Sequence, residues 1–169
     1  MEINISNDAL TTAAQKGGEA FLLAVADAVW QRVGKPLTAE GMQQLNASQI
    51  TLLGYTMLRD EVMCGGFIQL IYNGYGPFFF LNPFDKAMEV WGLSELYSML
   101  RKVHKLYSKY HKDIEAVETD DEFMALYEQY PQFDEFDDEF VEHEANYTLA
   151  AAHYLDEHLS DFVNVTEHE

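Results

Sequence analysis

The carboxylates of the C-terminal third are the side chains whose type and number carry the clearest chemistry in this sequence. Residues 113–169 contain nineteen Asp and Glu and no Lys or Arg. Residues 1–112 contain ten acidic and ten basic residues, so the whole formal charge of -19 arises from the last third. A surface of this kind attracts cations and basic proteins, and it repels nucleic acids and anionic membranes.

The densest part of this third places seven carboxylates in residues 134–144. On a helix this is one negative charge per roughly 2.3 Å, beside one per about 1.7 Å along double-stranded DNA. Asp134, Asp138 and Glu142 are four residues apart and would form one ridge, with neighbours about 6 Å apart. Such a ridge resembles a row of phosphates. The alternative is a solvated face whose acids suit a helix N-terminus, but ordinary surfaces intersperse both signs of charge.

We therefore take the clustered acids of residues 118–144 as candidate partner-binding residues that stand in for phosphates. They are Glu118, Asp120, Asp121, Glu122, Asp134, Glu135, Asp137, Asp138, Glu139, Glu142 and Glu144. The run lacks the glycine and the alternating spacing of a calcium-binding EF-hand loop. Nothing in it selects one pair of carboxylates for catalysis.

Three histidines near carboxylates are the other chemical candidates. They are His143, His153 and His158, and His153 with Glu157 has the four-residue spacing of a metal-binding pair. No Glu-x-x-His sequence occurs, so the signature of di-iron helical bundles is missing, and so is the zinc-protease pattern. We expect no metal, no cofactor and no enzymatic activity. A metal-dependent enzyme that uses these histidines stays open as an alternative.

The elements that must position these residues are predicted to be helices. Apolar residues recur at helical spacing from Glu19 to Val33 and again from residue 46 to Val62. Thr119 followed by Glu122 is a capping-box pattern, and one long helix is predicted from residue 133 to residue 162. Strand-like alternation is scarce. The sequence therefore predicts one all-α domain over residues 1–169, with acidic helices in residues 113–169.

The remaining composition bears on location and burial. A single cysteine, Cys64, rules out an internal disulfide framework, and we expect a buried thiol in a cytoplasmic protein. The N-terminus lacks the features of a signal peptide, and no apolar stretch is long enough to cross a membrane. We expect residues 78–81, Phe-Phe-Phe-Leu, to be buried in the core or in a subunit contact.

The middle of the chain carries a glycine-rich motif, Gly65-Gly66-Phe67 followed by Gln69 and Asn73. No Lys-Ser or Lys-Thr follows the glycines, so a phosphate-binding loop is not expected, and tight helix packing is favoured. The motif resembles the Gly-Gly-Phe-x-Gln core of a widespread bacterial domain family. The acidity and the mass of 19.4 kDa resemble the DNA-mimic proteins within that family.

The resemblance implies an all-α homodimer that binds a helix-turn-helix transcription factor at its DNA-binding surface and so relieves repression. The net negative charge predicts that the protein itself does not bind nucleic acid. The resemblance identifies no contact residue, because the family's motif contains none of the candidate acids. An acidic inhibitor or immunity-type protein that neutralises a nuclease or a histone-like protein needs the same negative face, so this second interpretation stays open.

Overall fold

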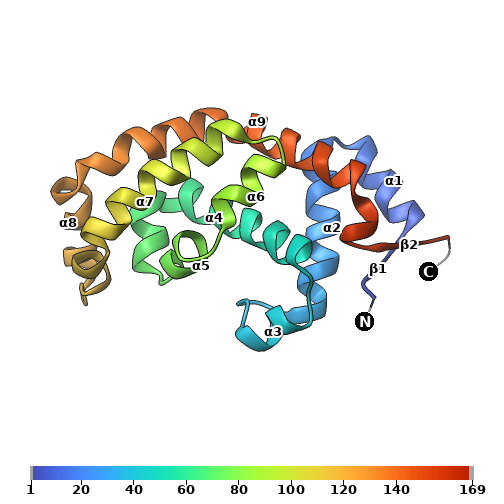
Figure 1. Ribbon diagram of the computed structural model, residues 1–169, viewed down its shortest axis with the longest axis horizontal. Coiled ribbons are helices and arrows are strands. Elements are labelled where there is room, and N and C mark those ends of the chain that lie inside the picture. The colour runs from blue at the N-terminus through green and yellow to red at the C-terminus, as the bar shows by residue number, and fades with distance from the viewer. Residues whose placement is uncertain (1, 168–169) are drawn as a thin grey trace. The chain divides into compact units, whose positions relative to one another are not determined.

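Helices make up nearly all of the regular structure of this chain. The computed structural model describes residues 2–167, and Figure 1 shows these elements along them. The α-helices are α1 (Asn7–Gln15), α2 (Gly18–Val33), α3 (Ala39–Gln43), α4 (Ala47–Tyr72), α5 (Gly76–Phe80), α6 (Phe84–Val90), α7 (Ser94–Glu115), α8 (Asp120–Gln129) and α9 (Asp134–Glu157). Single 3-10 turns cover Pro131–Phe133 and Leu159–Asp161. The predicted all-α class is confirmed.

Two short strands pair the ends of the described chain. β1 (Asn4–Ser6) and β2 (Asn164–Thr166) run parallel, with Asn4 opposite Asn164. The sequence did not predict them, because three residues are too few to show an alternating pattern.

The described residues divide into two compact units. The first comprises the residues up to Thr56 together with those from Asn146 onward, and the second comprises Met57–Ala145. The division falls inside α4 and inside α9, so each of these helices contributes to both units. The single-domain organisation expected from the length of the chain stays a prediction.

The first unit has a core built on α2. Leu22, Val25 and Val29 are fully buried on its apolar stripe, as the helical spacing predicts. Some polar side chains of this core pair with one another. The indole nitrogen of Trp30 donates a 3.2 Å hydrogen bond to the hydroxyl of Thr56. Pairing of this kind offsets the cost of burying a polar group.

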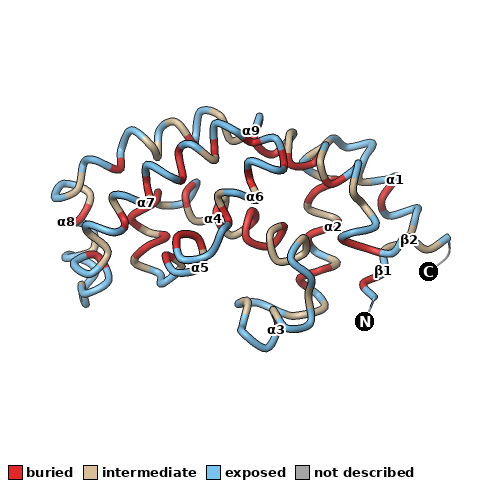
Figure 2. The backbone as a smooth tube through the Cα atoms, in the orientation of Figure 1, coloured by how far each residue is buried: buried red, intermediate tan, exposed pale blue. Residues whose placement is uncertain are grey.

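The second unit has an aromatic core to which α4 and α9 both contribute. Phe67 and Phe140 meet edge to face with 6.4 Å between ring centroids. Phe133 and Phe140 are fully buried, and Phe136 is half-buried, so these aromatics fix α9 from its inner side. Figure 2 shows buried and exposed residues alternating along α7 and α9, as expected of helices that pack on one face.

Several expectations from sequence need correction. Cys64 is exposed, not buried, because it lies on the outer side of α4. The last long helix ends at Glu157, short of the predicted residue 162, and a 3-10 turn follows. Phe79 and Phe80 are buried as expected, whereas Leu81 is 69% exposed in the single chain and is therefore not part of its core, and the alternative of a subunit contact stays a prediction. Among the helices of the described residues, none combines the length and the apolar character needed to cross a membrane.

Candidate functional site: the acidic helices α8 and α9

The first half of α9 displays a ridge of carboxylates. Asp134, Asp138 and Glu142 are all exposed. They follow one another at intervals of four residues along one helix, so they lie on the same face. We call these three residues the acidic ridge. Glu135 beside them is also exposed. Like charges at this spacing repel each other, so the ridge costs stability unless cations meet it.

The first turn of α8 carries a second group of acids. Asp120, Asp121 and Glu122 are exposed there, where negative charge is favoured by the helix dipole. The hydroxyl of Thr119 accepts a 3.1 Å hydrogen bond from the backbone N–H of Glu122, which confirms the predicted cap. The Glu122 carboxylate in turn accepts a bond from the N–H of Glu118 at 3.2 Å. These acids therefore start the helix and remain open to solvent.

Three of the predicted site residues are shielded. Glu139 is half-buried. Nε of Arg59 lies 2.7 Å from Oε1 of Glu144, and the two side chains are only 17% and 15% exposed. Asp137 is also half-buried, and its Oδ1 accepts a 2.8 Å hydrogen bond from the backbone N–H of Phe67. These three carboxylates are partly shielded from solvent by the protein, so we do not count them as part of the exposed acidic surface.

Burial has a marked effect on Asp137. The pKa of this carboxyl is raised to about 7, chiefly because burial removes solvent and to a lesser extent because of the nearby charges of Asp134 and Asp138. The hydrogen bond from Phe67 acts in the opposite direction and lowers it. At neutral pH Asp137 therefore carries only part of a charge, unlike a phosphate.

The predicted set thus separates into two groups. Eight of its eleven residues are exposed, and we call these eight the exposed acids: Glu118, Asp120, Asp121, Glu122, Asp134, Glu135, Asp138 and Glu142. The signal that distinguishes the shielded members was present in the sequence. Asp137 and Glu144 fall at three- and four-residue steps from the buried Phe133 and Phe140, so they lie on the inner stripe of α9.

The glycine-rich motif is the feature that ties both acidic helices to α4. Gly65 and Gly66 have non-helical backbone angles inside α4, and Gly66 has a φ of +75° that favours glycine. We call the segment Gly65-Gly66-Phe67 the glycine kink. Here the N–H of Phe67 meets Asp137 of α9, and the carbonyl of Gly65 accepts a 2.7 Å hydrogen bond from the hydroxyl of Tyr127 of α8.

The polar residues that follow the kink bridge its two sides. Gln69 and Asn73 both donate to the carboxylate of Glu61, at 3.0 and 2.9 Å. Sequence reasoning favoured tight packing for this motif but missed Glu61 and Tyr127 as its partners. No local pattern marks Tyr127, because its contact with Gly65 joins residues 62 positions apart in the sequence.

Basic side chains gather on a different helix of the same unit. Arg101, Lys102, Lys105, Lys109 and Lys112 of α7 are all exposed, and within residues 2–167 none of the five forms an ion pair. We call them the basic face of α7. The exposed acids are therefore not neutralised by the lysines and arginine of this helix.

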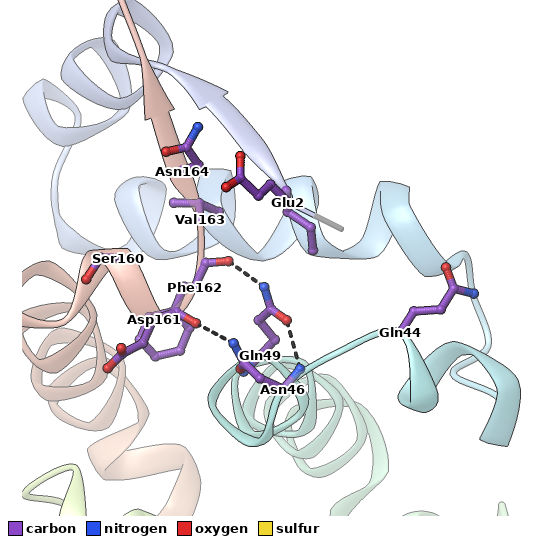
Figure 3. Close-up of a pocket in the computed structure, with 10 residues that line it drawn as sticks. Glu2, Gln44, Asn46, Gln49, Ser160, Asp161, Phe162, Val163 and Asn164 are labelled. Atoms are coloured by element: carbon purple, nitrogen blue, oxygen red, sulfur yellow. Dashed lines mark hydrogen bonds between the residues drawn. The ribbon is translucent and has the colours of Figure 1, made fainter.

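The first unit contains a polar pocket of about 380 Å³ (Figure 3). The side chain of Asn46 donates to the carbonyl of Asp161 at 2.9 Å, and that of Gln49 donates to the carbonyl of Phe162 at 2.8 Å. These bonds attach the start of α4 to the segment after α9. The pocket's central amides therefore have a structural use.

The histidines form no metal site in the described chain. His153 Nε2 lies 3.1 Å from Glu157 Oε1, but both side chains are more than half exposed. No group of three His, Cys, Asp or Glu residues is arranged to hold a metal ion in the part of the chain that the structure describes. The alternative of a metal-dependent enzyme gains no support from these contacts.

The described chain is thus an all-α acidic protein whose exposed carboxylates lie on and beside two helices. The chain belongs to the DMP19-like protein family, whose sequence model matches residues 43–158, more than half of its length. It is 33% identical over 104 residues to the DNA mimic protein DMP19 of Neisseria meningitidis serogroup B. That match covers 61% of this chain and 63% of the relative, which is less than two thirds of the relative's length.

Proposed function

We propose that this protein is a DNA mimic that binds the DNA-binding surface of a helix-turn-helix transcription factor and keeps it from its operator. The acidic ridge is the observation that carries the proposal, because its three exposed carboxylates repeat at about 6 Å, near the spacing of phosphates along one strand. The similarity to a relative named DNA mimic protein DMP19 supports the same proposal.

Phosphate contacts supply much of the affinity of a protein for DNA without reading its sequence. Carboxylates placed like phosphates would capture this part of the binding energy. Four of the other five exposed acids lie on α8 or just before it, and the fifth, Glu135, lies beside the ridge on α9. In this proposal the protein is not an enzyme, needs no cofactor, does not bind nucleic acid itself, and acts in the cytoplasm as a homodimer.

A second candidate is an acidic inhibitor of another basic protein, such as a nuclease or a histone-like protein. The same exposed acids would serve it, since any basic cleft that binds phosphates would accept them. The identity of the captured protein separates the two candidates.

The first experiment captures the partner. The immobilised protein is incubated with lysate of its source organism at low salt, eluted with a salt gradient, and the bound proteins are identified by mass spectrometry. We expect a helix-turn-helix protein that elutes with increasing salt. Recovery of a nuclease or histone-like protein instead would favour the second candidate.

The second experiment measures competition between this protein and the partner's operator DNA in a gel-shift assay. The test variant Asp134→Asn/Asp138→Asn/Glu142→Gln removes three charges from the acidic ridge. The control variant Asp27→Asn/Asp156→Asn/Glu157→Gln removes the same number of charges from exposed positions of the first unit. We expect competition to fall by about tenfold or more only in the test variant. Equal competition by both variants would overturn the placement of the binding surface.

A further inference from the structure

The glycine kink presents two backbone groups that a continuous helix would have used internally. The N–H of Phe67 and the carbonyl of Gly65 lie on either side of Gly66, where the helix opens. Unpaired backbone groups are costly away from water, so a partner is needed for each. Side chains from two different helices supply those partners.

The first partner is Asp137, which comes from the inner stripe of α9. Its Oδ1 accepts the Phe67 N–H at 2.8 Å, and it lies between two members of the acidic ridge, Asp134 and Asp138. A Cβ added to Gly66 would meet the Asp137 carboxylate, so only glycine lets this side chain approach. The hydrogen bond between Phe67 and Asp137 therefore depends on the absence of a side chain at Gly66.

The second partner is Tyr127 of α8. Its hydroxyl donates to the Gly65 carbonyl at 2.7 Å, and the residue lies on the same helix as the first-turn acids Asp120 and Asp121. Both helices that carry the exposed acids are thus bonded to the same three residues of α4. Neither bond uses an exposed acid.

We propose that Asp137 is a positioning residue for the acidic ridge: by bonding to Phe67 in the glycine kink, it fixes the acid-bearing start of α9 on α4, as Tyr127 fixes α8. The purpose of this arrangement rests on the proposed function, but the arrangement itself is testable without any partner. Asp137 belongs to the same acidic run as Asp134 and Asp138, but in this proposal its role is to hold these two neighbours in place.

The charged and titratable groups around Asp137 come from three helices. Asp134 and Asp138 precede and follow it on α9, Tyr127 faces it from α8, and Cys64 of α4 lies near Tyr127. No basic group contributes to the shift of its pKa, and burial is the largest cause. The Phe67 amide is therefore the natural reporter of the state of Asp137.

The test is an NMR and hydrogen-exchange experiment on the full chain. In the wild type we expect the Phe67 amide resonance to move with a midpoint near the Asp137 pKa of about 7. In Asp137→Asn the movement should vanish while the amide stays protected, because the side-chain oxygen still accepts. In Asp137→Ala, exchange of the Phe67 amide and of residues 134–142 should rise by about tenfold or more, as for loss of a hydrogen bond to a charged group.

Two further variants keep the test decisive. Tyr127→Phe should raise exchange in α8 but leave the titration of the Phe67 amide unchanged. Asp134→Asn/Asp138→Asn should leave the protection of that amide unchanged. A Phe67 amide that does not titrate in the wild type, or normal protection of α9 in a folded Asp137→Ala variant, would overturn the proposal. If Asp137→Ala does not fold, a Phe67 amide that titrates in the wild type but not in Asp137→Asn supports the proposal, and a Phe67 amide that titrates equally in both overturns it.

Discussion

Arg59 Nε lies 2.7 Å from Oε1 of Glu144, in a pair whose side chains are only 17% and 15% exposed. Glu142, two residues earlier on α9, is exposed and belongs to the acidic ridge. Two glutamates of the same run therefore have different uses. One connects α9 to α4 inside the second unit, and the other is free to meet a partner.

This difference predicts that two matched substitutions change the free energy of unfolding by unequal amounts. Glu144→Gln should lower the free energy of unfolding by about 2 kcal/mol, because Arg59 then keeps a largely shielded charge without its carboxylate. Glu142→Gln should change it by less than about 0.5 kcal/mol, because the residue is exposed. Urea unfolding followed by circular dichroism measures both. Equal stability of the two variants would contradict the structural use of Glu144.

The glycine kink predicts that Gly66 tolerates no side chain. Gly66→Ala should destabilise the protein by about 3 kcal/mol or more, since the left-handed backbone and the collision with Asp137 both add cost. Gly74→Ala is the matched control, because Gly74 has a φ of +87° and open space around it. The control should lose only about 1 kcal/mol from its backbone conformation. Thermal unfolding of both variants gives the comparison.

The pKa of Asp137 predicts a pH dependence of stability. Burial raises this pKa from the ordinary 3.8 to about 7 in the folded protein. Between these values the folded state binds more protons than the unfolded state, so this group's contribution to the free energy of unfolding decreases as pH rises from about 4 to about 7 and is level above. In Asp137→Asn this part of the slope should be absent. Urea unfolding from pH 5 to pH 8 checks the prediction, and an identical slope in the variant would contradict it.

The exposed acids on α8 and α9 predict how the association rate constant with a captured basic partner depends on salt. The association rate constant should decrease as salt increases, because opposite charges steer the encounter. The ridge variant Asp134→Asn/Asp138→Asn/Glu142→Gln should show a weaker salt dependence. Lys102→Gln/Lys105→Gln/Lys109→Gln, on the basic face of α7, should associate at least as fast as the wild type. Stopped-flow measurements over a salt series test this, and slower association of the lysine variant would contradict it.

The sequence predicted the class of fold because helical patterns are local. Apolar spacing located α2, and the capping pattern at Thr119 located the start of α8. The sequence predicted this helix only as far as Val62 and did not predict that a second helical segment follows directly after the kink at Gly65 and Gly66. The reason the helix resumes lies in Asp137 and Tyr127, which approach from distant parts of the chain.

The sequence identified the acidic run that forms the candidate site, but it did not identify which of the chosen acids are exposed. Counting charges identified the acidic run, and the structure shows eight of its eleven chosen residues exposed. The count ignored which face of α9 each residue occupies, so Asp137 and Glu144 were included although they share a stripe with buried Phe140. Exposure of Cys64 was missed for a related reason, because burial was predicted from the residue type and not from the face of α4 that the residue occupies.

That exposed thiol offers a practical handle. Cys64 is the single cysteine of the chain, and its neighbour Gly65 accepts the bond from Tyr127. A maleimide fluorophore therefore attaches to the native sequence at one known place, with no cysteine engineered in or out. Its emission would follow, in real time, any loosening of α8 from α4 when a captured protein docks or leaves.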